Sequence, residues 1–118
     1  MYYKVLYKTM DLDINESQIK KGIIEIAILI ILKSEKYGSE IIEMLKRENI
    51  DLPEGTLYPV LSRLNKNEYL SYRWQESTGG PPRKYFQITE KGLDYLAQCQ
   101  EILNQLTKSI KNLNSKSK

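Results

Sequence analysis

Residues 69–89, YLSYRWQESTGGPPRKYFQIT, place a run of glycine and proline between two segments of alternating polarity. Leu70 and Tyr72 recur at every second position in the first segment, as Phe86 and Ile88 do in the second. Such alternation is typical of strands with one covered face, and a turn rich in glycine and proline joins them into an antiparallel hairpin. The stretch therefore predicts a two-stranded hairpin.

The turn of this hairpin, STGGPPR, leads into Arg83 and Lys84. A phosphate loop of the nucleotide-binding kind requires a helix after the glycines, and a polyproline ligand requires P-x-x-P spacing; neither pattern is present. Two interpretations remain: a turn whose charges only keep it soluble, or a stiff tip that contacts a polyanion. The basic helix that precedes the hairpin favours the polyanion.

That helix is predicted from PEGTLYPVLSRLNK, residues 53–66, which has the period of an amphipathic helix. One face of this helix is apolar and the opposite face is polar. The apolar face is formed by Leu57, Val60, Leu61 and Leu64. We expect Pro59 to be tolerated because residues 53–56 open the helix, where N–H groups have no intrahelical partner. The exposed side carries side chains suited to phosphates and base edges, namely Thr56, Tyr58, Pro59, Ser62, Arg63 and Lys66.

Two of these side chains have alternative roles. Tyr58 is amphipathic, and its alternative is packing against Pro59 and the hairpin. Arg63 has the alternative of pairing with a neighbouring glutamate, and an exposed pair of that kind is worth under about 1 kcal/mol.

Upstream, the segment GIIEIAILIILK predicts a helix that is buried on most sides. Asn15, with a glutamine three residues later, has the spacing of a capping box and marks the expected start, and the helix is expected to end near Ser34. A second helix is predicted from a cap at Ser39 to about Arg47. Residues 1–14 are expected to form an N-terminal arm or a short helix.

A final helix is predicted over residues 90–113, capped by Thr89 and followed by a disordered tail at residues 114–118. Its apolar residues follow the three- and four-residue spacing of a coiled-coil seam. Because the seam is short, it should form a dimer only together with apolar surface of the first helix. The predicted interface comprises Ile24, Ile28, Leu96, Cys99, Leu103, Leu106, Ile110 and Leu113.

The composition limits the chemistry. The chain has 118 residues, a net charge of +3, no histidine and a single cysteine. Imidazole-based catalysis and Cys/His zinc sites are thereby removed, and no pair of carboxylates stands in a pocket-like context. We therefore expect neither an enzyme nor a cofactor. No segment has the length of a membrane span or the pattern of a secretory signal, so we expect a cytoplasmic protein.

Three blocks, KGIIEIAILIILKSEKYGSEI, LPEGTLYPVLSRLNKNEYL and GGPPRKYFQITEKG, closely resemble successive signature segments of PadR-type transcriptional regulators. The resemblance covers roughly residues 20–96 and is to the smaller type with a single C-terminal helix. It implies a mainly α fold with a two-stranded β wing. The winged helix-turn-helix would occupy residues 15–89, and residues 90–113 would form a long C-terminal dimerisation helix.

The resemblance also implies a homodimeric repressor that binds a palindromic operator in double-stranded DNA and releases it when a small molecule or another signal acts. The helix at residues 54–66 would enter the major groove, and Arg83 and Lys84 would reach the backbone or the minor groove. Tyr37 and Gly38 match the family's Tyr-Gly pair, which would place Tyr37 at a phosphate. The alternative is a winged-helix module that binds protein instead of DNA.

Two further expectations concern apolar sites. An effector is expected between the first and last helices, in a pocket lined by Leu96, Cys99 and Leu103. Trp74, the only tryptophan, lies in a wing strand, where we expect it to pack in the core.

Overall fold

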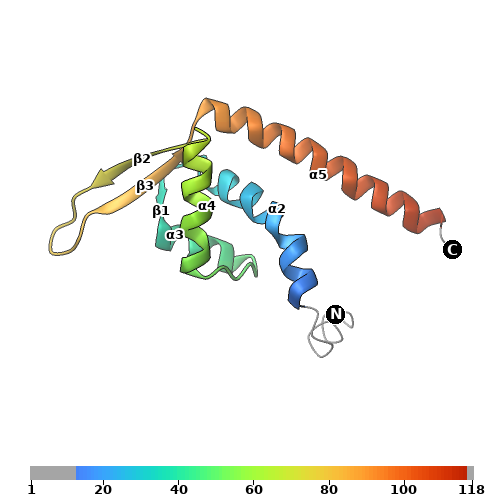
Figure 1. Ribbon diagram of the computed structural model, residues 1–118, viewed down its shortest axis with the longest axis horizontal. Coiled ribbons are helices and arrows are strands. Elements are labelled where there is room, and N and C mark those ends of the chain that lie inside the picture. The colour runs from blue at the N-terminus through green and yellow to red at the C-terminus, as the bar shows by residue number, and fades with distance from the viewer. Residues whose placement is uncertain (1–12, 117–118) are drawn as a thin grey trace.

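The structure, a computed structural model, describes residues 13–116. Helices α2, α3 and α4 form a body from which the β2–β3 wing projects on one side and α5 on the other (Figure 1). The arm or short helix expected at residues 1–14 lies outside the described residues, except for its last two, which belong to α2. In chain order the elements are α2 (Asp13–Ile31), β1 (Lys36–Tyr37), α3 (Gly38–Arg47), α4 (Glu54–Lys66), β2 (Leu70–Gln75), β3 (Arg83–Ile88) and α5 (Glu90–Lys116).

The wing has the predicted antiparallel pairing, with Leu70 opposite Ile88 and Gln75 opposite Arg83. A third strand, β1, pairs with the other edge of β3, so the sheet order is β1-β3-β2. The sequence does not predict this strand, because two residues are too few to show alternation. The backbone N–H of Ile88 also donates a 2.8 Å hydrogen bond to the carbonyl of Leu32. The base of the wing is therefore joined to the end of α2.

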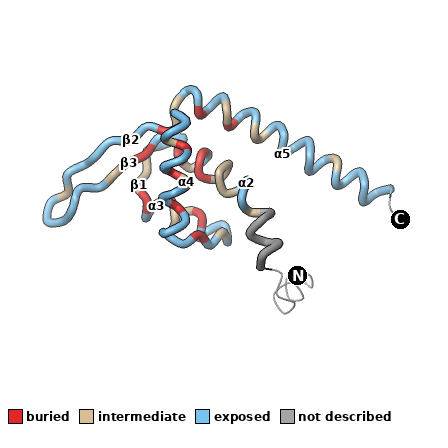
Figure 2. Tube along the Cα trace, in the orientation of Figure 1, coloured by how far each residue is buried: buried red, intermediate tan, exposed pale blue. Residues whose placement is uncertain are grey.

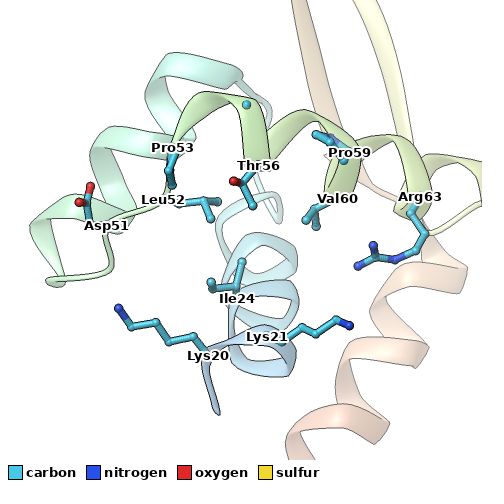
Figure 3. A pocket seen from close by; sticks show the side chains of 11 residues that line it. Lys20, Lys21, Ile24, Asp51, Leu52, Pro53, Thr56, Pro59, Val60 and Arg63 are labelled. Carbon is cyan, nitrogen blue, oxygen red and sulfur yellow. The ribbon is translucent and has the colours of Figure 1, made fainter. Parts of the chain in front are cut away.

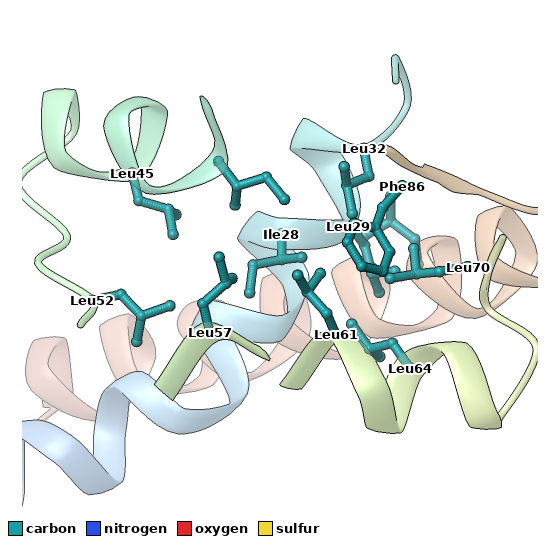
Figure 4. Close-up of a cluster of buried hydrophobic side chains, with 12 residues drawn as sticks. Ile28, Leu29, Leu32, Leu45, Leu52, Leu57, Leu61, Leu64, Leu70 and Phe86 are labelled. Carbon is teal, nitrogen blue, oxygen red and sulfur yellow. The ribbon is translucent and has the colours of Figure 1, made fainter. Parts of the chain in front are cut away.

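The hydrophobic core lies where the three helices of the body meet the base of the sheet and the start of α5. Burial is concentrated there, whereas the tip of the wing and most of α5 are exposed (Figure 2). Full burial of one such side chain contributes roughly 1.5–3 kcal/mol. The core side chains are Ile28, Leu29, Leu32, Ile41, Leu45, Leu52, Leu57, Leu61, Leu64, Leu70, Phe86 and Leu96 (Figure 4).

The predicted cap of α2 and the expected place of Pro59 in the first turn are wrong, although α4 starts at Glu54 as predicted. α2 begins at Asp13, so Asn15 is an interior residue and not the cap; the helix also ends at Ile31, before the expected end. α4 begins at Glu54, which puts Pro59 beyond the first turn. The proline there removes the bond that an N–H would donate to the carbonyl four residues earlier. The buried leucines on the opposite side of α4 stabilise the helix despite this loss.

The start of α3 uses a different cap from the predicted Ser39, which lies inside the first turn. Tyr37 is the N-cap residue, and its backbone N–H donates a 3.1 Å hydrogen bond to Glu40 Oε1. A glutamate at this position satisfies one of the backbone donors at a helix start, as in half of a capping box. Helix α3 therefore begins directly from strand β1.

α5 is attached to the wing by the predicted cap and by a close backbone approach. Thr89 Oγ1 accepts a 3.0 Å hydrogen bond from the N–H of Gly92 and donates at 2.7 Å to the carbonyl of Glu68. A methyl group on Gly92 would overlap the carbonyl oxygen of Tyr69 and lie 2.6 Å from Ile88 Cγ1. These contacts fix the direction in which α5 leaves the wing.

The C-terminal end of α5 differs from the prediction. The helix continues to Lys116, so residues 114–116 of the expected disordered tail are helical, and residues 117–118 lie outside the described part. No helix within residues 13–116 combines the length and the hydropathy that crossing a bilayer requires.

Candidate nucleic-acid interface

The exposed face of α4 carries the predicted polar and basic side chains. Leu57, Leu61 and Leu64 are at most 1% exposed and hold the other face against the core. All six residues predicted for the outer face are exposed: Thr56, Tyr58, Pro59, Ser62, Arg63 and Lys66.

A cavity of about 380 Å³ lies between the start of α3, the middle of α4 and the part of the wing next to its tip. We call it the wing cavity. It brings together five residues of the predicted DNA-binding set, because β1 pairs with β3 and continues directly into α3. These residues are Tyr37, Gly38, Tyr58, Arg83 and Lys84, and Ser39, Trp74 and Pro82 complete the lining.

Close packing at Gly38 holds Tyr58 in the wing cavity. A methyl group on Gly38 would overlap the Tyr58 hydroxyl and lie 3.0 Å from Cζ of that ring. Tyr58 nevertheless remains 46% exposed, so packing covers one side of the ring and leaves the other side free. The ring packs against Gly38 of α3, whereas the alternative considered from the sequence was packing against Pro59 and the hairpin; the contact of Tyr58 with DNA stays a prediction.

Arg83 and Lys84 lie on opposite faces of the wing, because neighbouring strand residues alternate. The Arg83 guanidinium stands 4.7 Å from the centre of the Tyr37 ring. The Lys84 ammonium stands 4.0 Å from the centre of the Tyr72 ring and 5.6 Å from that of Trp74. Both cations therefore rest on aromatic rings and line the wing cavity.

Trp74 contradicts the sequence prediction, because its side chain is 61% exposed and not in the core. The body covers only the base of the wing, where Leu70 and Phe86 are each 3% exposed. Trp74 lies further along the same face and has no helix over it. With the half-exposed Tyr72, it forms an aromatic surface beside Lys84.

An ion pair fixes β1 to the wing. Arg73 donates two hydrogen bonds of 2.7 Å to the carboxylate of Glu35, one from Nε and one from Nη2. These hydrogen bonds hold the pKa of Glu35 below its usual value, despite the opposing effect of desolvation. The Arg73 guanidinium also stands 4.9 Å from the centre of the Tyr85 ring. The strand that leads into α3 is thereby held against the base of the wing.

Arg63 takes the alternative role considered from the sequence. Its Nη2 donates a 2.6 Å hydrogen bond to Glu25 Oε2 on α2. The Arg63 side chain is 48% exposed, so the pair contributes under about 1 kcal/mol. A guanidinium has five N–H donors, and one pair with a carboxylate leaves donors for a phosphate.

A larger groove of about 700 Å³ runs along the other flank of α4, between that helix and α2. We call it the α2–α4 groove (Figure 3). Its lining comprises Lys20, Lys21, Ile24, Asp51, Leu52, Pro53, Gly55, Thr56, Pro59, Val60 and Arg63.

The model of the PadR-like family of transcriptional regulators matches residues 28–98, from the centre of α2 through the wing to the first part of α5. The chain belongs to the PadR-like family. This family consists of transcriptional regulators and not of enzymes.

Solved structures of PadR proteins share the fold. A PadR-like transcription factor of Bacteroides fragilis is 41% identical, with a TM-score of 0.73 over 83% of this chain and 96% of that one. A PadR family regulator of Eggerthella lenta is 26% identical and covers 99% of both chains with a TM-score of 0.82. An uncharacterised protein of Lysinibacillus sphaericus is 37% identical over 86 residues, which are 70% of this chain and 79% of that protein. The predicted winged helix with a long C-terminal helix is confirmed.

This PadR-family chain has a second candidate surface between α2 and α5. A groove of about 520 Å³ lies there, and we call it the α2–α5 groove. Cys99, Leu103, Leu106 and Ile110 line this groove. All four belong to the dimer interface predicted from the sequence, and Cys99 and Leu103 belong also to the predicted effector pocket. Leu113 follows on the same helix and is 65% exposed.

Three residues of the predicted dimer interface lie elsewhere. Ile28 is fully buried and Leu96 is 1% exposed, so both belong to the core of the chain itself and neither is accessible to a partner or an effector. Ile24 lines the α2–α4 groove instead. The helical turn of α2 that reaches the α2–α5 groove carries Ile23 and Ile26.

The sequence analysis missed Ile102, which lines the α2–α5 groove and is 60% exposed. Its spacing to Leu106 and Ile110 is i, i+4, i+8, and this signal was sufficient to find it. Tyr95 was also missed. Burial, followed by a hydrogen bond with Cys99, raises the pKa of Tyr95 to about 12, so its hydroxyl stays neutral at physiological pH. Among residues 13–116, no three His, Cys, Asp or Glu side chains gather to hold a metal ion.

Proposed function

We propose that this PadR-family regulator is a homodimeric repressor that binds double-stranded DNA through α4 and the wing. The observation that carries the proposal is the wing cavity, which Tyr58 of α4 lines together with Arg83 and Lys84 of the wing, beside the exposed face of the helix. The helix presents hydroxyl and basic side chains next to a basic hairpin. A single DNA duplex can contact both surfaces at once, which favours one duplex over a separate partner for each.

The dimensions of α4 fit this role. An α-helix is about 10–12 Å wide with its side chains, and the major groove of B-DNA is about 12 Å wide. Ser62 and Lys66 stand at the centre of the exposed face and are placed to meet base edges or phosphates. Arg83 and Lys84 carry full charges beside that face and are placed to meet the sugar-phosphate backbone.

The dimer is supported by apolar surface that the rest of residues 13–116 leaves uncovered. Ile102, Leu106 and Ile110 are 60%, 56% and 60% exposed along one face of α5. An exposed apolar stripe of this kind marks an interaction site. A two-fold dimer would present two copies of α4, and a palindromic operator mirrors that symmetry.

Release of the DNA in response to a signal is supported by the α2–α5 groove, which the residues of this stripe help to line. A small apolar molecule that binds one arrangement of α2 and α5 more tightly than another would shift the population between them and change the spacing of the two DNA-binding surfaces. A regulator of transcription acts on the chromosome, so the proposed location is the cytoplasm of a bacterial cell.

The test is fluorescence anisotropy with a labelled duplex from the region upstream of the chain's own coding sequence. The variant Arg83→Ala/Lys84→Ala should bind at least about tenfold more weakly and with a smaller salt dependence. The matched control, Lys108→Ala/Lys111→Ala, removes the same charge from exposed positions on α5. Wild-type binding that is absent or independent of salt would contradict the proposal and favour a module that binds protein.

The dimer has its own test. Leu103→Glu/Leu106→Glu places charges on the stripe and should yield monomers or unfolded protein in sedimentation velocity, whereas Lys108→Glu should leave the dimer intact. An intact, folded wild-type monomer at micromolar concentration would remove this part of the proposal.

A further inference from the structure

The α2–α4 groove is a basic surface that the predicted DNA-binding set touches only through α4. Lys20 and Lys21 of α2 form its far wall, opposite Thr56 and Arg63 of α4. The two lysines reach toward opposite ends of the groove, Lys20 toward Asp51 and Lys21 toward Arg63 (Figure 3). Three cations and one carboxylate line it, so the groove has a positive balance.

This groove and the wing cavity lie on the two flanks of the same helix. Tyr58 lines the wing cavity, whereas Arg63 lines the α2–α4 groove. At about 100° per residue, the two side chains point about 140° apart around α4. Ser62 and Lys66 lie on the exposed strip between them. The exposed strip of α4 is therefore bordered by cations on both sides.

A helix that fills a major groove has a phosphate strand on each side, because the groove is about as wide as the helix. Cations on one flank can neutralise only one of these strands. We propose that the α2–α4 groove binds the phosphates of the second strand through Lys20, Lys21 and Arg63, while the wing binds those of the first. This proposal rests on the proposed DNA binding and adds a second backbone contact to it.

The chemistry of the groove favours phosphates over bases. Lysine ends in a compact charge on a flexible stem, which suits a phosphate more than the fixed pattern of a base edge. The hydrogen bond to Glu25 holds the Arg63 guanidinium on the α2 side of α4, where Arg63 lines the same groove as the two lysines. The groove therefore contributes affinity that does not depend on the DNA sequence.

The test measures binding of the full-length chain to two labelled duplexes, one from its own upstream region and one of random sequence, over a range of salt concentrations. Lys20→Ala/Lys21→Ala is compared with Lys108→Ala/Lys111→Ala, which removes the same charge from exposed positions of α5. The first variant should weaken binding to both duplexes by the same factor, at least about tenfold. The salt slope of log affinity should fall by about 0.9 for each lost phosphate contact. Lys20→Arg/Lys21→Arg should restore both values.

Three results would overturn the inference. In the first result, wild type binds DNA and Arg83→Ala/Lys84→Ala does not, but Lys20→Ala/Lys21→Ala keeps the affinity and salt slope of the α5 control. The proposed DNA binding then stands, and only the phosphate contact of the α2–α4 groove is wrong. If the variant weakens binding to the upstream duplex alone, the lysines read bases and not phosphates. If wild type binds neither duplex, the proposed function and this inference both fail.

Discussion

Replacement of Gly92 by alanine should destabilise the chain by about 2–3 kcal/mol, although alanine is the better helix former. The added methyl group would overlap the carbonyl oxygen of Tyr69 and lie 2.6 Å from Ile88 Cγ1. The same carbonyl accepts a 3.0 Å hydrogen bond from the backbone N–H of Thr89, so it cannot rotate away without losing that bond. Relief therefore requires α5 to move away from the wing.

The expected loss in the free energy of unfolding of Gly92→Ala follows from three effects. Overpacking of a closely packed site costs about 1–3 kcal/mol. A shift of α5 also weakens the Thr89 cap, which is worth about 0.5–2 kcal/mol. The gain from replacing a helical glycine offsets about 0.5–1 kcal/mol of this loss. For a chain of this size the net loss corresponds to a fall in Tm of about 10 °C.

Urea unfolding followed by circular dichroism, at one fixed protein concentration, measures the effect. The matched control is Gly55→Ala in the first turn of α4, because a methyl group there meets no atom within 4 Å. The control should be unchanged or slightly more stable. Equal unfolding free energies for Gly92→Ala and Gly55→Ala would refute the claim that α5 is rigidly seated on the wing.

Three further predictions test the interface and the backbone. Gly38→Ala should displace the Tyr58 ring from the wing cavity and weaken DNA binding about tenfold in anisotropy; unchanged affinity would show that the ring position does not matter. Glu68 has a φ of 66°, so Glu68→Gly should stabilise the chain by about 1 kcal/mol in urea unfolding, and a loss of stability would contradict this. The pKa of Glu35 is lowered from 4.5 by Arg73, so the folded state favours the carboxylate. The stability that wild type gains over Glu35→Gln should be present above pH 4.5 and should disappear as the pH falls through the lowered pKa; a difference that persists at low pH would refute the pairing.

The elements with a strong local pattern could be predicted from the sequence. α4 shows a clear helical period, and its buried leucines were identified as one apolar arc. The wing shows alternation on both sides of a glycine and proline turn, and Thr89 was identified as the cap of α5. In each case the local preference and the tertiary packing agree.

The structure differs from the sequence predictions where tertiary packing, and not the local pattern, determines the position of a residue. Strand β1 exists because β3 has a free edge, and two residues carry no readable period. Trp74 follows the correct alternation, but alternation does not show how far along the wing the helices extend. Leu96 satisfies the apolar spacing of a seam and Ile28 belongs to a helix that is apolar on most sides, yet both are buried in the core of the chain itself. The apolar stripe on α5 becomes accessible only beyond the point where that helix leaves the body.

Only part of the candidate DNA-binding surface could be predicted from the sequence. The helical wheel placed Tyr58 and Arg63 about 140° apart on the outer side of α4, but it did not show which element packs on each flank. Tertiary packing determines this, and it places the wing on one side of α4 and α2 on the other. For the same reason Lys20 and Lys21, which belong to a helix chosen for its apolar residues, received no role.

In the homodimer that we propose, the rigid seating of α5 on the wing would make the length of α5 set the distance between the two DNA-binding surfaces. Each residue inserted between Gly92 and Ile102 would turn the apolar stripe by about 100° and move it by about 1.5 Å relative to the wing. In the proposed dimer, a single insertion would turn the stripe away from the partner subunit, whereas seven residues would restore its direction and move the two DNA-binding surfaces further apart. Such a dimer could change the distance between half-sites only in steps of whole helical repeats.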